Sequence, residues 1–463
     1  MLPSNLLAQN MPATNGEQQR LQDNLLQSEG KLNAKQQRLK EQISEKVSTQ
    51  LLKQATTARD PISNDTTGRK GPKLQISLLT CGPGNEVYEY YGHSAIRVLR
   101  TDSAGFDLTF NYGVFDFNTD NFALKFAMGD TYYLCVAQPT QDFVDSYRHS
   151  GRYIDEQVLN LTQNECLHIY SALMENIKPE NRTYLYNFLY DNCATRVRDI
   201  IENNLDSKLQ YPERPTERSF RDAIHFFCRN AKWSIFGQDL LLGAQADMPA
   251  TGHELEFAPL ILEQDIDNAL VMSESYMVHT LVLKKHRLLE AGTIDTTPAF
   301  PLSPTTSATL LLIGAVVLGA WEIRKKRIIW PVDSVLLLTQ GIAGFITTFV
   351  FFFSVHPTVG SNWLVWILNP LPLVGLYWQL RGARRHDYKQ YHMVAAPILA
   401  LFLIASRSLP QHFGTAIIVL ALLLLVRSTT NLIVWYKVRK ATSTILTHSL
   451  TNTPCNQTNT YHP

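Results

Sequence analysis

The last third of the chain contains five long apolar runs, and these constrain the fold more than any other feature. An α-helix needs about 20 apolar residues to cross the hydrocarbon core of a bilayer. Five such runs in succession would make an implausible soluble core, so the sequence predicts a membrane region of five helices. Because the first and fourth runs are short, four helices is the alternative. The runs cover residues 307–321, 334–355, 363–380, 393–406 and 413–436.

Basic clusters between these runs predict which side each connection faces. Clusters at 324–327, 381–389 and 437–440 follow the first, third and fifth runs. The two connections on the other side, 354–363 and 407–414, together contain a single arginine. Loops rich in Lys and Arg stay in the cytoplasm, so the domain before the first run is expected in the periplasm. The chain starts without the apolar core of a signal peptide, which leaves the export route open.

Changes in composition divide the sequence into five parts. Residues 1–73 are rich in Gln, Asn, Lys and Ser, which favours a polar helical or disordered tail. Residues 74–210 contain short strand-like runs followed by helical patterns, which predicts an α+β domain. We expect residues 211–300 to form a helical extension that leads to the membrane region at 301–440. Residues 441–463 are expected to form a polar cytoplasmic tail.

Five short runs in the α+β domain predict a mostly antiparallel sheet. Each run is rich in β-branched or aromatic residues and is bounded by Gly, Asp, Asn or Pro. A capping box at Thr162 and Glu165 then begins a helix, which Pro179 ends. The predicted strands cover residues 74–79, 95–99, 106–112, 132–137 and 154–161.

The stretch YNFLYDNCATRVRD places Cys193 at the predicted start of another helix. Asp191 or Asn192 can cap this helix, and apolar residues recur at helical spacing after it. A helix N-terminus favours a thiolate, and Arg196 and Arg198 add positive charge nearby. Because these influences lower a cysteine pKa, Cys193 is a candidate nucleophile. The alternative is a buried, inert cysteine.

His93 is a candidate base for this thiol because it follows a glycine at the start of a predicted strand. Catalytic cysteine and histidine residues meet in space, so a long separation in sequence does not count against the pair. Asn111, Tyr112 or Asp116, one strand later, is a candidate to orient the imidazole. The alternative for His93 is a core or surface histidine.

Two further residues near His93 are candidates for the same site. Cys81 is a rival nucleophile, since it follows a strand and precedes a Gly-Pro-Gly turn, although it lacks a helix start and neighbouring arginines. Glu86 is a candidate to line the cleft, with simple solvation as its alternative.

Composition argues against several classes of function. The six cysteines include no C-x-x-C pair and no His/Cys spacing suited to zinc, so we expect no disulfide scaffold, no structural metal and no cofactor. Lys and Arg (42) almost balance Asp and Glu (41), which predicts no nucleic acid partner.

Three other features have simple physical interpretations. Trp233 and Phe236 are expected in the core, with an acyl-binding or membrane-facing lip as the alternative. The charged run KKHR at 284–287 is expected on a solvated helix face near the bilayer. Arg427, inside the fifth apolar run, is expected to snorkel toward the cytoplasmic interface.

Four separated motifs resemble a known bacterial family. TCGPGNEVYEYYGHSAIRV, FNYGVFDF, YNFLYDNCATRVRD and WSIFGQDLLLGAQADMP look like the family with an Lnb N-terminal periplasmic domain, and the resemblance spans residues 74 to 436. The order of His on a strand, a polar residue on the next strand and Asn-Cys on a later helix also resembles permuted papain-like (NlpC/P60-like) thiol enzymes. The resemblance implies an α+β permuted papain-like domain followed by an α-helical transmembrane bundle.

The resemblance also implies a function and residue roles. The family is associated with lipoprotein N-acylation at the bacterial inner membrane. The implied partners are a membrane phospholipid as acyl donor and a lipoprotein N-terminus as acceptor, while the oligomeric state stays open. Cys193 would be the nucleophile, His93 the base and Asn111 the third residue, ranked above Asp116. The supporting or oxyanion candidates are Asn192, Tyr112, Arg196 and Glu86.

Two alternative functions use the same residues differently. A membrane-anchored cysteine amidase or peptidase acting on cell-wall peptide would use water as the second nucleophile, and it would present an open polar cleft rather than a dry acyl site. A non-catalytic membrane scaffold would leave the Cys193 sulfur and the His93 ring beyond hydrogen-bond reach.

Overall fold

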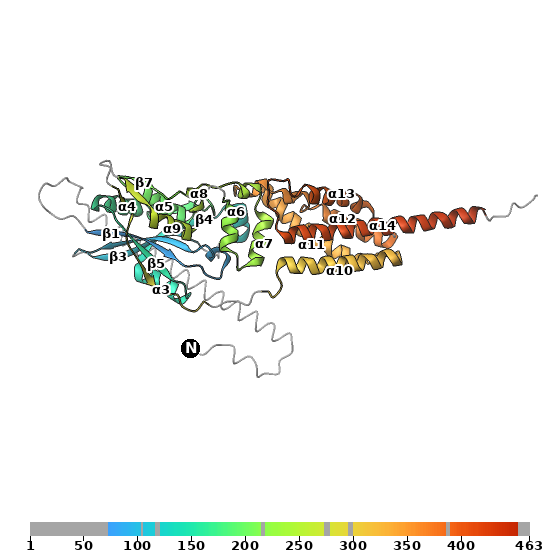
Figure 1. The fold of residues 1–463 in the computed structure, drawn as a ribbon, viewed down its shortest axis with the longest axis horizontal. Coiled ribbons are helices and arrows are strands. Elements are labelled where there is room, and N and C mark those ends of the chain that lie inside the picture. The colour runs from blue at the N-terminus through green and yellow to red at the C-terminus, as the bar shows by residue number, and fades with distance from the viewer. Residues whose placement is uncertain are drawn as a thin grey trace, which may run out of the picture.

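The molecule is elongated, with a sheet and its helices at one end of the long axis and a bundle of long helices at the other (Figure 1). The computed structural model describes residues 73–102, 105–115, 121–213, 218–272, 278–294, 300–385 and 389–451. The predicted N-terminal tail up to residue 72, Asp116 and the chain after Thr451 lie outside the described residues.

A seven-stranded antiparallel sheet forms the centre of the first part, in the order β10-β5-β1-β2-β3-β4-β6. The predicted mostly antiparallel sheet is therefore confirmed. β1 and β2 pair so that Cys81 lies opposite His93. The strands are β1 (Leu74–Cys81), β2 (His93–Arg100), β3 (Phe106–Val114), β4 (Tyr132–Pro139), β5 (Ile154–Leu159), β6 (Thr183–Leu185) and β10 (Val282–Leu289).

Helices cover both faces of this sheet, and alternate side chains of each strand supply the two cores. Ile96 and Phe110 belong to the core under α4 and α5, whereas Leu79 and Ala95 pack with Phe143 of α3 on the other face. Figure 1 shows α3 on one side of the sheet and α4, α5 and α9 on the other. The helices are α3 (Thr140–His149), α4 (Gln163–Asn176), α5 (Cys193–Glu202) and α9 (Pro259–Asn268).

The expected helical extension at 211–300 is only partly helical. It contains α6 (Phe220–Phe227), α7 (Lys232–Leu241), η3 (Ala244–Asp247), α8 (Gly252–Leu255) and α9. Its C-terminal end forms β10, the edge strand of the main sheet. β8 (Leu270–Met272) pairs with both β9 (Val278–Thr280) and β7 (Lys208–Gln210) in a small second sheet.

The charged run KKHR lies on β10, so its expected place on a helix face is wrong. Lys285 forms an ion pair with Glu263 (3.0 Å) and Arg287 pairs with Asp155. Edge strands often carry charged residues, because charge discourages pairing with another chain. A charged edge strand and a solvated helix face therefore have the same composition, and composition alone does not distinguish them.

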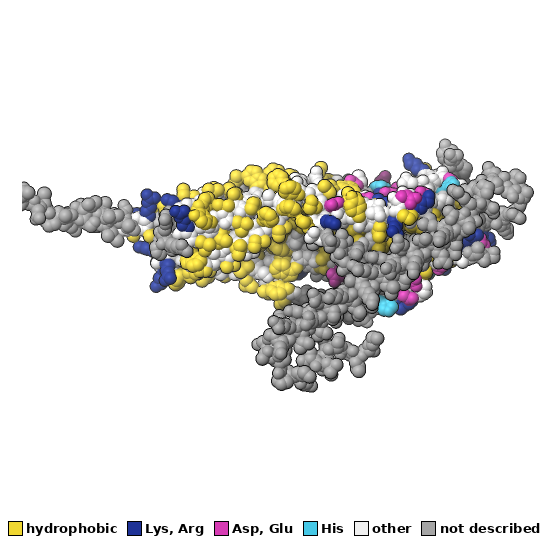
Figure 2. Space-filling model, turned by 180° about the vertical axis from the view of Figure 1, so that it is seen from behind, with side chains coloured by type: hydrophobic (Ala, Val, Ile, Leu, Met, Phe, Trp, Pro, Cys, Tyr) yellow, Lys and Arg dark blue, Asp and Glu magenta, His cyan; other side chains and the backbone are white. Residues whose placement is uncertain are grey.

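Three helices of the second part are long and apolar enough to span a membrane: α10 (Pro304–Lys325), α11 (Trp330–Phe353) and the segment Thr415–Ala441 of α14 (Thr415–Thr451). Their outward surface is a band of apolar side chains (Figure 2), and residues such as Val317, Phe345 and Phe352 are more than half exposed. Such a large exposed apolar surface is typical of a membrane-facing bundle.

The other two predicted spans form shorter helices, α12 (Leu371–Arg385) and α13 (Lys389–Ala405). The third apolar run begins with a 3₁₀ turn, η5 (Trp363–Trp366), and α12 starts only after Pro370. Asn369 Oδ1 accepts a hydrogen bond from Leu371 N–H (3.0 Å), which starts the new helix. Within the described residues, three of the five expected spans are thus supported by length and composition.

Arg427 does not snorkel to the interface, so that expectation is wrong. Its Nε and Nη2 donate to the two oxygens of Asp333 (2.8 and 2.9 Å), and its Nη1 donates to Glu322 (2.6 Å). Asn431 adds a hydrogen bond to Asp333 (3.0 Å). A charge in an apolar bundle is expensive unless it is paired, and here it joins α10, α11 and α14.

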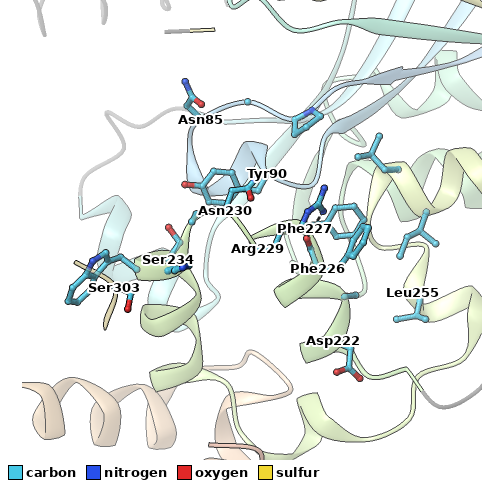
Figure 3. Close-up of a pocket in the computed structure, with 18 of the residues that line it drawn as sticks. Asn85, Tyr90, Asp222, Phe226, Phe227, Arg229, Asn230, Ser234, Leu255 and Ser303 are labelled. Atoms are coloured by element: carbon cyan, nitrogen blue, oxygen red, sulfur yellow. Dashed lines mark hydrogen bonds between the residues drawn. The ribbon is translucent and has the colours of Figure 1, made fainter. Parts of the chain in front are cut away.

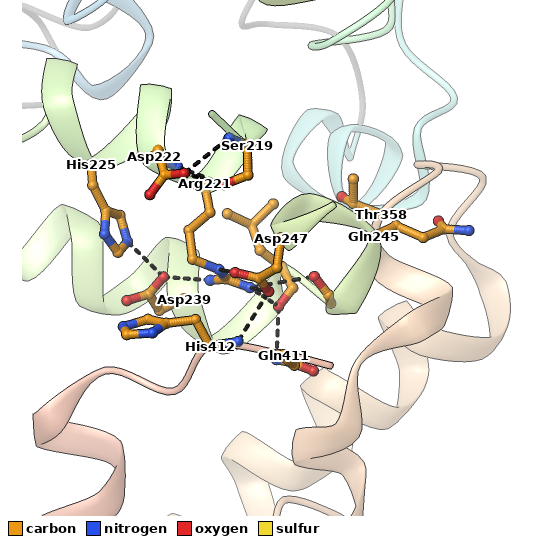
Figure 4. A network of polar contacts seen from close by, with 12 residues as sticks. Ser219, Arg221, Asp222, His225, Asp239, Gln245, Asp247, Thr358, Gln411 and His412 are labelled. Atoms are coloured by element: carbon orange, nitrogen blue, oxygen red, sulfur yellow. Dashed lines mark hydrogen bonds and ion pairs between the residues drawn. The ribbon is translucent and has the colours of Figure 1, made fainter. Parts of the chain in front are cut away.

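A second buried arginine joins the sheet domain to the bundle (Figure 4). Arg221 of α6 is 2% exposed and donates to Asp239 of α7 (2.5 Å) and Asp247 of η3 (2.7 Å). Asp247 also accepts from the backbone N–H of His412 (3.1 Å), in the connection between α13 and α14. Gln411 from the same connection donates to Leu242 O (3.0 Å), and this carbonyl oxygen also accepts a hydrogen bond from Arg221.

We predict that Arg221→Met lowers the free energy of unfolding by about 3–5 kcal/mol, because it leaves the buried carboxylate of Asp239 and the partly buried carboxylate of Asp247 without their shared cation. Thermal unfolding of the purified full chain in detergent measures the effect. Arg148→Met is the matched control, since Arg148 pairs with Asp145 on the exposed surface. That pair is worth at most about 1 kcal/mol. Equal shifts for the two variants would contradict the assigned role of Arg221.

Candidate active site

Cys193 is the first residue of α5, and Asn192 rather than Asp191 caps this helix. Asn192 Oδ1 accepts hydrogen bonds from the backbone N–H groups of Ala194 (2.8 Å) and Thr195 (3.1 Å). Its Nδ2 donates to the carbonyl oxygens of Phe188 (2.7 Å) and Phe257 (2.9 Å). Because Asn192 is buried and fully engaged, it fixes the start of the helix and with it the position of the thiol.

His93 is the first residue of β2, and its ring lies between Asn111 and Cys193. Nε2 is 2.7 Å from Asn111 Oδ1, and the ring also hydrogen-bonds the Cys193 side chain. Since Asn111 engages Nε2, Nδ1 is the nitrogen left for the thiol. An amide oxygen on Nε2 requires a proton there, which leaves the lone pair of the neutral ring on Nδ1, facing sulfur.

Gly113 allows the two residues to meet across the end of the sheet. His93 belongs to the face covered by α3, whereas Cys193 belongs to the helix on the opposite face. A bulge in β3 places Gly113, at φ +89°, between them. A Cβ at this position would lie 3.6 Å from Cys193 Cβ and 3.8 Å from His93 Cε1. These are ordinary van der Waals distances, so it is the left-handed backbone that favours glycine at this position.

The electrostatics of the pair favour a thiolate. Burial raises the pKa of the Cys193 thiol, but the neighbouring imidazolium and its hydrogen bond, with the backbone N–H groups of Ser94 and Cys193, lower it below its ordinary value. Burial lowers the pKa of His93, but the thiolate and the hydrogen bonds to Cys193 and Asn111 raise it overall. Each partner therefore stabilises the charged form of the other.

The two arginines expected to help do not act on the thiol directly. Arg196 forms a two-point ion pair with Asp191 (2.5 and 2.8 Å) and lies over the Tyr184 ring (3.7 Å). Arg198 pairs with Asp199 (2.7 Å). Their charges are thus balanced by other side chains, and the contact with His93 replaces them as the cause of the lowered pKa.

The remaining candidates lie outside the pair. Tyr112 points to the opposite face of β3 from Asn111 and is buried in the core, where its hydroxyl accepts from Asn176 (2.8 Å). Glu86 is exposed at the start of η2 (Val87–Glu89), and its N–H donates to the Glu89 carboxylate (3.3 Å). Burial raises the pKa of the rival thiol, Cys81, to about 12, which makes it a poor nucleophile at neutral pH.

The chain matches two family descriptions. Residues 66–223 match the Lnb N-terminal periplasmic domain, and residues 295–439 match the Lnb transmembrane domain. The two matches together cover well over half of the sequence. The chain belongs to the Lnb family. It is a membrane protein with a periplasmic domain. No curated protein and no solved structure gives a significant match.

Aromatic rings pack in the same region as the thiol of this Lnb domain, and sequence reasoning did not locate them. Tyr133 stacks on Tyr186 (4.0 Å between ring centroids) and on Phe115 (4.7 Å). Burial raises the pKa of both tyrosines, and the charge of the Cys193 thiolate raises it further. The three rings and Cys193 pack in or against the same core. Tyr147 of α3 lies parallel to the His93 ring (6.4 Å). These residues come from separate segments of the chain, and only the fold brings them together.

A large cavity in the described part of the Lnb chain is lined by neither His93 nor Cys193 (Figure 3). It has a volume of about 1550 Å³ and lies between the loop after β1, helices α6 and α7, and the start of α10. Asn85 and Tyr90 line it from that loop, which ends at His93. The cavity is therefore a neighbour of the pair, separated from it by one loop.

One group of residues in the described ranges resembles a cation site. Ligand atoms of Asp199, Glu202 and His253 lie within 4.8 Å of one another. Arg198 already forms an ion pair with Asp199 (2.7 Å), and its positive charge disfavours a cation there. We assign this group to ion pairing between α5 and α8.

We predict that Cys193 is alkylated by iodoacetamide with a rate midpoint below the usual pKa of a cysteine. In His93→Ala the favourable partner is lost while burial remains, so the midpoint should move to or above the usual value. Mass spectrometry of the Cys193 peptide as a function of pH measures both. The Cys81 peptide is the internal control and should stay unreactive at neutral pH. An unchanged midpoint in His93→Ala would contradict the ion pair.

Proposed function

We propose that this Lnb protein is a thiol acyltransferase that N-acylates the terminal cysteine of lipoproteins, with a membrane phospholipid as acyl donor. The observation that carries the proposal is the His93 ring, held by Asn111 on one nitrogen and facing the Cys193 thiol with the other. The family resemblance supplies the substrates. Both are held in the membrane, and the chain joins its periplasmic domain to apolar helices long enough to reach them.

The distribution of charge supports a multi-pass protein of the bacterial inner membrane with its thiol outside the cytoplasm. Lys and Arg gather at the end of the bundle farthest from the sheet domain, and the apolar band separates the two (Figure 2). The basic residues at that end include the exposed cluster at 324–327 and Lys437. Positive loops stay in the cytoplasm, so the sheet domain faces the periplasm.

In the first step, His93 Nδ1 removes the thiol proton and the Cys193 sulfur attacks an ester carbonyl of the phospholipid. The C–S bond forms, the acyl C–O bond breaks, and the lysophospholipid leaves with the proton from His93. The backbone N–H groups of Ser94 and Cys193, which contact the sulfur, are the donors nearest to the developing oxyanion. Loss of such a donor costs about 10²- to 10³-fold in rate.

In the second step, the α-amine of the lipoprotein's lipid-modified cysteine attacks the thioester. The C–N bond forms and the C–S bond breaks, while His93 takes a proton from the amine and returns it to the sulfur. No oxidant, metal or cofactor enters either step. The products are the amide and the free Cys193 thiol, ready for another cycle.

The surroundings of the thiol favour acyl transfer over hydrolysis. The ring stack of Phe115, Tyr133 and Tyr186 beside Cys193 is largely apolar, and it suits an acyl chain better than a hydrated cell-wall peptide. A thioester that must wait for an amine also needs a site with little water. The hydrogen bond between His93 and Cys193 argues against the scaffold alternative. A scaffold would leave the His93 ring and the Cys193 sulfur beyond hydrogen-bond reach.

Contacts with the bundle support delivery of a substrate from the membrane. Helix α2 (Phe122–Met128) follows β3, which carries Asn111, and it lies against the outer end of α11. Val355 N–H donates to Met128 O (2.9 Å), and His356 Nε2 lies 2.9 Å from Phe126 O. The thiol domain is thereby fixed on the membrane helices close to the strand that orients its base.

The test is complementation of cells that lack their own lipoprotein N-acyltransferase. The wild-type chain should restore N-acylated lipoproteins, measured by mass spectrometry of their N-terminal peptides, whereas Cys193→Ala should restore none. His93→Ala should lose at least about 100-fold, the usual contribution of a general base. Asn111→Ala should lose activity to a smaller extent, since it orients the ring without touching substrate.

Cys81→Ala is the matched control, because this cysteine lies opposite His93 on the neighbouring strand but has a raised pKa. It should keep most of the activity. Full restoration by Cys193→Ala would refute the proposal. If N-acylation were lost in Cys81→Ala but kept in Cys193→Ala, Cys81 would be the nucleophile instead of Cys193.

A further inference from the structure

A cleft with basic and apolar walls lies at the end of the bundle farthest from the thiol. It has a volume of about 650 Å³ and lies between the end of α10 and one side of α14. Its two walls include Lys326, Leu432, Ile433, Tyr436, Lys437 and Lys440, and we call it the basic cleft. Figure 2 shows dark blue side chains gathered at this end, where the apolar band stops.

The residues of α14 line the cleft in layers one helical turn apart. Leu432 and Ile433 lie nearest to the apolar band, Tyr436 and Lys437 come one turn later, and Lys440 follows after one more turn. Residues four apart share one face of a helix. A ligand along this face would therefore meet apolar side chains first and ammonium groups beyond them.

Lys326 reaches the cleft from the other helix, and its backbone is held in place. It ends α10 in the left-handed conformation (φ +52°), and its N–H donates to Glu322 O. The Glu322 side chain accepts a hydrogen bond from Arg427 of α14 (2.6 Å), which ties the end of α10 to α14. The lysine is thus presented at a fixed place opposite Lys437 instead of on a free loop.

We propose that the basic cleft binds an anionic phospholipid, with its phosphate among Lys326, Lys437 and Lys440 and its acyl chains along Leu432 and Ile433. Basic pockets between membrane helices on the cytoplasmic side are suited to anionic head groups. Tyr436, 60% exposed, offers a hydroxyl at the level of the head group and a ring at the level of the upper chain. The apolar wall favours a lipid over a soluble anion.

This lipid is distinct from the acyl donor of the proposed reaction, because the cleft between α10 and α14 and the helix α5 that carries Cys193 lie toward opposite ends of the molecule (Figure 1). The inference does not depend on acyl transfer. Its consequence is that the ends of α10 and α14 are held together by a lipid of the cytoplasmic leaflet.

The test is native mass spectrometry of the purified full chain in detergent, titrated with phosphatidylglycerol, phosphatidylcholine or inorganic phosphate. Phosphatidylglycerol should bind more tightly than phosphatidylcholine. The variant Lys326→Gln/Lys437→Gln/Lys440→Gln should bind phosphatidylglycerol at least about tenfold more weakly. The single variant Lys437→Gln should weaken binding about fivefold, and it serves if the triple variant does not fold.

The matched control is Arg324→Gln/Lys325→Gln/Arg439→Gln, which removes three charges from the same two helix ends without altering the cleft. It should change phosphatidylglycerol binding much less than the cleft variant does. Equal losses in the two triple variants would reduce the effect to general attraction by a basic surface and overturn the proposal. Equal binding of phosphatidylglycerol and phosphatidylcholine would also overturn the proposal. So would inorganic phosphate that competes for the cleft as strongly as the lipid does.

Discussion

The hydrogen bond between the His93 ring and the Cys193 thiol is the interaction on which the periplasmic domain is built. It joins the first residue of a central strand to the first residue of a helix on the other face of the sheet. The Asn192 cap fixes the helix, Asn111 fixes the ring, and Gly113 lies between them with a left-handed backbone that glycine adopts readily. Each of these contacts would be unremarkable alone. Together they stabilise a thiolate that burial by itself would suppress.

Buried arginines determine how this domain and its membrane region are held together. Arg221 and Arg427 each bind two carboxylates, in the junction and within the bundle respectively. Such groups add little stability compared with apolar packing, but the loss of one partner is costly, so they fix one arrangement of the helices. The periplasmic domain therefore sits on the bundle as a rigid unit, and not as a domain on a flexible tether.

Sequence reasoning located the features that depend on a few neighbouring residues. The helix start at Cys193, with Asp191 or Asn192 as its cap, and the place of His93 at the start of a strand follow from capping and strand patterns. The residues near His93 left Asn111, Tyr112 and Asp116 open, and only the family resemblance ranked Asn111 above Asp116. Contacts between distant segments could not be predicted. Arg427 binds residues 94 and 105 positions away, and β10 is a strand because it pairs with β5. The place of Arg196 near the start of α5 follows from the sequence, but only the folded loop shows that Asp191 balances its charge.

The covalent state of Cys193 tests the central claim most directly. The purified full chain is incubated with a phospholipid that carries isotope-labelled acyl chains and no lipoprotein, and the Cys193 peptide is then analysed by mass spectrometry. Acyl transfer through a thioester predicts a labelled acyl group on Cys193 that hydroxylamine removes and that does not form in His93→Ala. The absence of any acyl group on Cys193 in the wild-type chain, or a hydroxylamine-labile acyl group on another cysteine, would contradict it.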